Sequence, residues 1–263
     1  MELSERSESR FTGRVDSYKL ARPGYPKEIV ALLQRECGLT PQSRIVDVAA
    51  GTGIFAELFL ENGNIVTAIE PNVEMRSACI ELQRRYSRLL AIEGTAEHTG
   101  LPETCADFIT VAQALHWFHL ERTRKEFARI LKRNGWCVIA YNERRPDSDL
   151  FHRSYEDLLR RFGIDYEAVQ SKYPNEGALR AFFDPASMRR VRLDNFQLLD
   201  RDALIGRVVS SSYMPTPGHP GYDEMLKEIE RLFTENQRNG VVRLNYDCTL
   251  SYGQLAGKDC RKR

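Results

Sequence analysis

Two glycines and two carboxylates stand close together in the first third of the sequence. The segment Gly51–Ala56 fits the spacing G-x-G-x-x-[GA], and it is flanked by Asp47 and Glu70. Glycines let a ligand approach the backbone closely because they carry no Cβ, and the start of a following helix attracts an anion. The pattern therefore predicts a binding site for a nucleotide-like cofactor.

The glycine pattern by itself leaves two cofactors open. With Glu70 as the acid that accepts from a ribose hydroxyl, it satisfies a dinucleotide fingerprint and predicts an NAD-dependent oxidoreductase. Three features favour S-adenosylmethionine instead. A carboxylate at Asp47 would repel a pyrophosphate but attract a cationic amino group. A helix and the element Arg22–Pro26 precede the first strand, and Glu70 can bind both hydroxyls of an unphosphorylated ribose.

Several further motifs give the sequence a family resemblance. Asp47–Gly53 is similar to D-x-G-x-G-T-G, with Ala49 in place of the first glycine. The segments Glu70-Pro71, Gly94–Glu97 and Gln113–Phe118 follow in the matching order. The sequence resembles the class I S-adenosylmethionine-dependent methyltransferases of type 11, and in particular the trans-aconitate methyltransferase-like group.

This resemblance implies S-adenosyl-L-methionine as the cofactor and a set of residues that bind it. Arg22 is implied to bind its carboxylate, and the loop Thr95–Glu97 to receive its adenine. Simpler interpretations remain open, since Asp47 could cap the next helix, Glu70 could be a helix-start acid and Met75 could fill the core. The implied cofactor-binding residues are Tyr18, Arg22, Asp47, Ala49, Gly51, Gly53, Glu70, Pro71, Met75, Thr95, Ala96, Glu97, Gln113 and Ala114.

Fewer residues indicate how an acceptor would be handled. His116 is the candidate catalytic residue, as a general base or as a donor to a substrate carboxylate, although a structural histidine is equally compatible. Trp117 and Tyr213 are candidate substrate contacts, with core packing and loop polarity as the alternatives. His116 and His119 would share a face if both lay on a helix, but no third ligand is evident and no metal is expected.

Alternating patterns over residues 44–141 provide the elements that position these side chains. Short β-branched runs alternate with amphipathic segments, which predicts βαβ units and a parallel sheet. Expected strands include 44–48, 65–69 and 136–141, and expected helices include 26–37 and 121–131, the last ending before Asn134-Gly135. The expected class is α/β, a Rossmann-like doubly wound, mostly parallel seven-stranded sheet with helices on both faces and an inserted lid.

The expected organisation has three parts. Residues 1–145 form an N-terminal cover and the cofactor-binding core, 146–221 an insertion or lid, and 222–263 the last helix and strand. The net charge of +1 argues against a polyanion-binding protein, so no nucleic acid partner is expected. The six cysteines are scattered, the N-terminus is polar and no long apolar run occurs, which favours a cytoplasmic protein without a membrane span. The expected oligomeric state is a monomer or a homodimer.

The sequence therefore predicts a methyltransferase acting on a small-molecule acceptor. Methyl transfer to a carboxylate needs no general base near pH 7, because the carboxylate is already ionised, whereas a hydroxyl acceptor would benefit from one such as His116. The likeness to the trans-aconitate group suggests a small acid that becomes a methyl ester. Two alternatives stay open, an NAD-dependent oxidoreductase and a catalytically inactive cofactor-binding regulatory protein.

Overall fold

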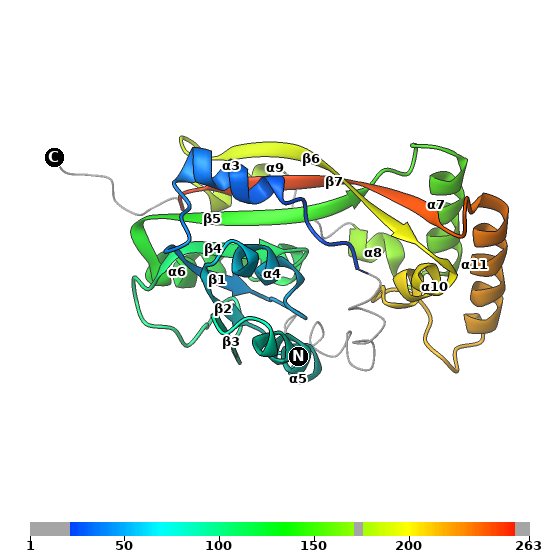
Figure 1. The fold of residues 1–263 in the computed structure, drawn as a ribbon, viewed down its shortest axis with the longest axis horizontal. Helices are drawn as coiled ribbons and strands as arrows, with labels where there is room; N and C mark the ends of the chain where they lie inside the picture. The colour runs from blue at the N-terminus through cyan, green and yellow to red at the C-terminus, as the bar shows by residue number, and fades with distance from the viewer. Residues whose placement is uncertain (1–21, 171–175, 256–263) are drawn as a thin grey trace.

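A seven-stranded sheet runs through the computed structural model, which describes residues 22–170 and 176–255 (Figure 1). The strands lie in the order β3-β2-β1-β4-β5-β7-β6. Strands β1 to β5 are parallel, and β7 runs antiparallel between β5 and β6. The predicted α/β class is confirmed. The strands are β1 Arg44–Val48, β2 Ile65–Ile69, β3 Leu89–Ile92, β4 Ala106–Ala112, β5 Leu131–Arg144, β6 Arg189–Leu199 and β7 Val242–Gly253.

Helices cover both faces of this sheet. Helices α3, α4 and α5 contribute to the apolar core on one face, and α6 and α9 to the core on the other. The helices described here are α3 Glu28–Cys37, α4 Ile54–Glu61, α5 Val73–Glu81, η2 Leu82–Arg84, η3 Leu115–Trp117, α6 Leu120–Ile130, α7 Leu150–Phe162, α8 Tyr166–Gln170, α9 Glu176–Phe182, α10 Arg201–Val209 and α11 Tyr222–Asn236.

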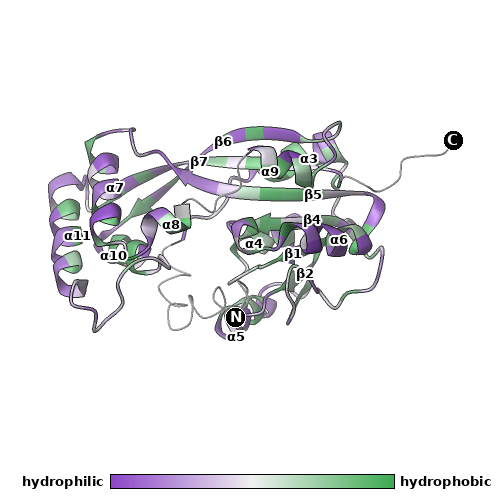
Figure 2. Ribbon diagram, turned by 180° about the vertical axis from the view of Figure 1, so that it is seen from behind, coloured by the Kyte–Doolittle hydropathy of each residue, from purple (hydrophilic) through white to green (hydrophobic). Residues whose placement is uncertain are grey.

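A third core lies at the far ends of the long strands. Strands β5, β6 and β7 extend beyond their shorter neighbours, and α7, α8, α10 and α11 gather around this extension (Figure 1). Helices α7 and α11 alternate hydrophobic and hydrophilic residues, as helices with one buried face do (Figure 2). Buried residues of the four helices pack with Leu244 and Tyr246 of β7.

Local sequence explains where several helices begin and end. The Asn72 side chain accepts a hydrogen bond from the Met75 amide at 2.9 Å and caps α5. Gly38 ends α3 in the left-handed conformation, with φ 70°. Asp149 and Asp200 cap α7 and α10 in the same way as Asn72 caps α5.

Two strands differ from the expectation. Strand β5 begins at Leu131, and its register against β4 shifts so that Leu131 faces Ala106 while Trp136 faces Phe108. Residues 132–135, expected as a break, therefore belong to an irregular stretch of the strand. Strand β6 lies within the segment 146–221, and all eleven of its residues pair with β7 in the central sheet.

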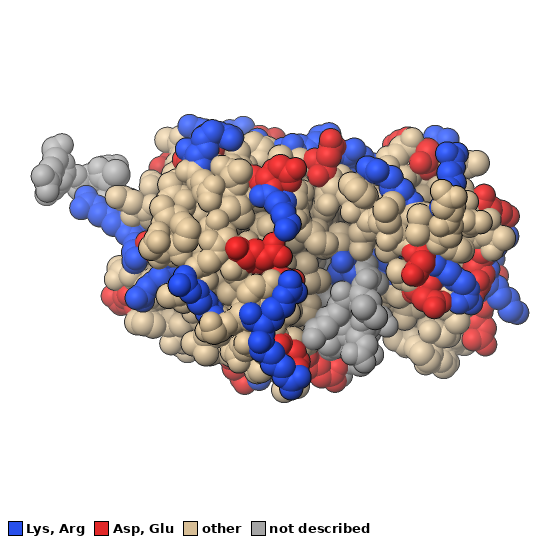
Figure 3. Space-filling model, viewed as in Figure 1, with Lys and Arg blue, Asp and Glu red and all other residues tan. Residues whose placement is uncertain are grey.

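The strand order reverses at β1, between β2 and β4. In doubly wound sheets, ligands bind outside the carboxyl ends of the strands at such a switch point. Asp47 lies near the carboxyl end of β1, and the loops that follow β1 and β4 hold Ala49 to Gly53 and Gln113. Over the described part of the chain, no helix combines the length and the apolar character needed to cross a membrane. Acidic and basic side chains are intermixed on the face shown in Figure 3.

Candidate active site

The loop between β1 and α4 has an unusual backbone conformation. Gly51 and Gly53 have φ of 57° and 87°, and Ala49 has φ 54°. A Cβ on Gly53 would lie 2.7 Å from Leu82 Cδ1 and 3.0 Å from Cys79 Sγ, so a larger residue would have to displace these side chains besides adopting a positive φ. An alanine in the left-handed region costs about 1–2 kcal/mol, and the fold accepts this cost at Ala49.

Asp47 is a buried carboxylate with one unsatisfied oxygen. The side chain is 1% exposed, and its Oδ1 accepts a hydrogen bond from Thr110 Oγ1 at 2.6 Å. Its Oδ2 has no hydrogen-bond partner among the described residues, and Asp47 lines the pocket beside the glycine loop. Burial raises the pKa of Asp47 to about 7, and the bond from Thr110 only partly opposes this rise. An ammonium group binding here would supply the missing donor and favour the ionised carboxylate.

Glu70 connects the glycine loop to the start of α5. Its Oε2 accepts from the Gly51 amide at 2.8 Å, and its Oε1 accepts from the Asn72 amide at 2.9 Å. The Glu70 carboxylate therefore holds the glycine loop against the start of α5. Pro71 follows, and the Met75 side chain is buried at 3% exposure, which is compatible with its core interpretation.

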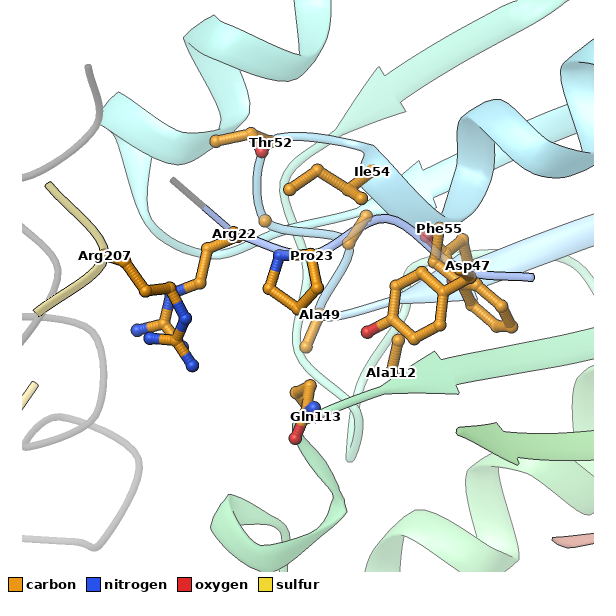
Figure 4. Close-up of a pocket in the computed structure, with 13 residues that line it drawn as sticks. Arg22, Pro23, Asp47, Ala49, Thr52, Ile54, Phe55, Ala112, Gln113 and Arg207 are labelled. Atoms are coloured by element: carbon orange, nitrogen blue, oxygen red, sulfur yellow. The ribbon is translucent and has the colours of Figure 1, made fainter. Parts of the chain in front are cut away.

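A pocket opens between the glycine loop, the N-terminal segment and α10 (Figure 4). Of the predicted cofactor residues, it brings together Arg22, Asp47, Ala49, Gly51 and Gln113. The predicted residues that do not line it are Gly53, Glu70, Pro71, Met75, Thr95, Ala96, Glu97 and Ala114. Tyr18 lies outside the described residues.

The N-terminal segment is fixed across the pocket by hydrogen bonds from distant elements. Asn142 of β5 and Asn195 of β6 both donate to the Gly24 carbonyl, at 3.1 and 2.8 Å. Arg22 Nη2 donates to the Ser210 carbonyl at the end of α10, at 2.8 Å. These contacts place an arginine at the mouth of the switch point. Gln113, with φ 54°, follows β4 on the opposite wall.

The loop after β3 has structural contacts of its own. Thr95 and His98 bond each other through their backbones, and Ala96 is 3% exposed. Glu97 Oε1 accepts from the His119 amide at 2.8 Å and thereby ties this loop to the start of α6. Their predicted role in receiving adenine therefore depends on the loop backbone more than on the Glu97 carboxylate.

His116 and Trp117 lie on the short helix η3, outside the pocket lining. His116 Nδ1 is 3.3 Å from the Tyr141 hydroxyl, and its ring lies 4.6 Å from the Trp117 ring. Trp117 packs against two of the apolar cores. His119 caps the next helix, α6, so His116 and His119 do not lie on one helix. Within residues 22–170 and 176–255, no cluster of three or more metal-binding side chains occurs.

Sequence reasoning missed a charged network beneath the pocket. Arg207 of α10 lines the pocket and is 4% exposed, and Arg144 of β5 pairs with Glu156 of α7 at 3.0 Å. Tyr213 lies beside Arg144, whose Nη1 is 3.5 Å from its hydroxyl. Burial favours a higher pKa for Tyr213, but Arg144 and Arg207 outweigh it and lower that pKa. The sequence signal for Arg207 is that it is a single charged residue within the otherwise uncharged segment 204–209.

Comparisons with known proteins agree with this geometry. A family model described as a methyltransferase domain matches residues 46–139. An uncharacterized methyltransferase of Mycobacterium tuberculosis is 33% identical over 207 residues, which cover 78% of each chain. The malonyl-[acyl-carrier protein] O-methyltransferase of Pectobacterium atrosepticum is 29% identical over 133 residues, covering 50% of this chain and 49% of that protein. A candidate type II methyltransferase structure from Anaeromyxobacter dehalogenans superposes with TM-score 0.63 at 21% identity, covering 89% of this chain and 97% of that one.

Proposed function

Because the chain belongs to the S-adenosylmethionine-dependent methyltransferases, we propose that it methylates an oxygen of a small-molecule acceptor, at a carboxylate or hydroxyl group. The observation that carries the assignment of the pocket is the unsatisfied Oδ2 of Asp47, a residue that lines the pocket together with the glycine loop at the switch point of the sheet. An oxygen acceptor is supported by the arginines around the same pocket, and by the O-methyltransferase activity named for the Pectobacterium relative.

Each end of the pocket suits one charge of the cofactor's amino acid part. Asp47 offers an acceptor for its ammonium group, and Arg22 offers donors for its carboxylate. Glu70 holds the glycine loop and can accept from the ribose hydroxyls. When bound, S-adenosylmethionine supplies an activated methyl group on a sulfonium. The protein's task is then to align the acceptor oxygen and exclude water, because an ionised carboxylate needs no proton removed.

A hydroxyl acceptor would need a base, and two groups are candidates. His116 is linked to the Tyr141 hydroxyl, and Tyr213 has a lowered pKa. Neither lines the pocket, which favours an acceptor that is already ionised, such as a carboxylate. The two earlier alternatives are not favoured, since the relatives are methyltransferases and Asp47 would oppose a pyrophosphate.

Ligand-dependent thermal unfolding tests the cofactor assignment first. S-adenosylhomocysteine and S-adenosylmethionine should raise the unfolding midpoint, and NAD should leave it unchanged, because only a ligand of the native state stabilises it. Methyl transfer from labelled S-adenosylmethionine to a panel of carboxylic and hydroxy acids then tests the acceptor. Alkaline release of labelled methanol identifies an ester, and exclusively N-methylated products would refute the proposal.

A further inference from the structure

Arg207 is a buried cation with no acidic partner among the residues that the structure describes. Its Nε donates to the Tyr246 hydroxyl at 3.1 Å, and its Nη1 donates to Ser211 Oγ at 3.2 Å. Among the described residues, no carboxylate forms an ion pair with Arg207, and none accepts from its Nη2. An uncompensated buried charge is costly, so such a group is normally paired with a counter-ion. Because Arg207 lines the pocket, a bound ligand is the natural source of that counter-ion.

The neighbouring charges do not compensate Arg207. Glu156 is already paired with Arg144 at 3.0 Å, and Arg22 is positioned by the Ser210 carbonyl. Nearby, the Tyr155 hydroxyl is buried and has no hydrogen-bond partner within residues 22–170 and 176–255. The Arg207 guanidinium and the Tyr155 hydroxyl therefore both have unused hydrogen-bonding capacity, and both suit an incoming oxyanion.

The position of Arg207 assigns it to the acceptor rather than to the nucleotide. Arg207 lies on α10, which packs in the third core with α7, α8 and α11. It does not belong to the loops that follow β1 to β4. In Figure 4 its guanidinium and that of Arg22 reach toward the same side of the pocket, with Asp47 on the other side. Since Arg22 suffices for one carboxylate of the cofactor, Arg207 remains for a second anion.

We propose that Arg207 binds a carboxylate of the acceptor that is separate from the oxygen receiving the methyl group. This inference rests on the proposed function and deepens it, because it defines an acceptor with an anionic anchor and a second, nucleophilic oxygen. A carboxylate held by a guanidinium has its lone pairs engaged and is a poorer nucleophile, so anchor and nucleophile must differ. A single surplus cation matches a carboxylate better than a phosphate dianion.

Small dicarboxylates are the probes for this anchor. The enzyme saturated with S-adenosylhomocysteine is titrated with malonate, glutarate, their monoamides and inorganic phosphate, and the unfolding midpoint is followed. A dicarboxylate should raise the unfolding midpoint of the wild type. The Arg207→Gln variant should bind that dicarboxylate at least tenfold more weakly. Arg207→Lys, which keeps the charge without the planar fork, should weaken it less.

A matched control and the cofactor itself separate the outcomes. Arg201→Gln removes an exposed arginine of the same helix, paired with Glu230, and should leave dicarboxylate binding unchanged. All variants should bind S-adenosylhomocysteine as the wild type does. The anchor would be overturned if neither dicarboxylate stabilised the wild type, or if only phosphate did. It would also be overturned if the dicarboxylates stabilised Arg207→Gln as much as the wild type. Failure of the wild type to bind S-adenosylhomocysteine would instead refute the proposed function.

Discussion

Asp47→Asn replaces one buried oxygen by an NH₂ group and removes a titratable charge at almost constant shape. In the folded protein without cofactor, burial raises the pKa of Asp47 from 3.8 to about 7. The folded state therefore keeps a proton that the unfolded state loses, and wild-type stability decreases as the pH rises through this window. The variant has no such titration. Groups that do not interact with Asp47 titrate alike in both proteins and cancel in the difference, and Glu70 is the acidic neighbour that adds to the raised pKa of Asp47.

The size of the effect follows from the two pKa values. Between pH 5 and pH 8, the contribution of Asp47 to the unfolding free energy of the wild type falls by about 1.4 kcal/mol per pH unit, and only up to about pH 7. The unfolding free energy of Asp47→Asn minus that of the wild type should therefore increase by about 2.7 kcal/mol over this range. Any constant cost of the buried NH₂ group is the same at both pH values and drops out of this comparison.

Urea unfolding of both proteins without cofactor, at pH 5 and pH 8, measures this difference. In parallel, calorimetry at pH 8 should show S-adenosylhomocysteine binding about tenfold to a hundredfold more weakly to Asp47→Asn, because a charged hydrogen bond to its ammonium is lost. S-adenosylhomocysteine keeps the ammonium but has no transferable methyl, so chemistry does not interfere. A stability difference that is equal at both pH values, together with unchanged affinity, would refute the reasoning about Asp47.

Two further substitutions test the fold around the site by chemical or thermal unfolding. Gly53→Ala should destabilise the protein by about 1–3 kcal/mol or more, and more than Gly218→Ala, because both glycines have positive φ but only Gly53 lacks room for a Cβ; equal losses would contradict this. Glu156→Gln should cost about 3–5 kcal/mol, since it leaves the Arg144 guanidinium buried without its counter-ion. This contribution should be lost as the pH falls, because Glu156 has a lowered pKa. The exposed Asp157→Asn should change stability by less than about 0.5 kcal/mol.

Patterns within a few residues of each other were enough to predict much of the cofactor-binding half. The strands Arg44–Val48 and Ile65–Ile69 have the bounds expected from the sequence, and the glycine loop between them leads into a helix. Asn72 caps its helix with its own side chain, which bonds an amide three residues away. These features depend on backbone conformation, capping and hydrophobic periodicity, which act between near neighbours and are therefore visible in the sequence.

Residues after the fourth strand were harder to interpret from sequence. The pairing of Arg189–Leu199 with β7 joins segments about fifty residues apart, and no local pattern specifies that register. Residues 132–135 look like a turn in isolation, but β4 pairs with the strand on both sides of them. Tertiary pairing outweighed local propensity in both cases.

The sequence by itself determined the α/β class, the glycine loop and the carboxylates that indicate S-adenosylmethionine, because their spacing is a local property of one strand, one turn and one helix. Only the tertiary structure decided which side chains meet across the pocket. It turned the Glu97 carboxylate toward α6 and His116 toward Tyr141, and it brought Arg207 to the glycine loop from more than 150 residues away. Packing of distant elements fixes side-chain direction, and that information is not carried by residue spacing.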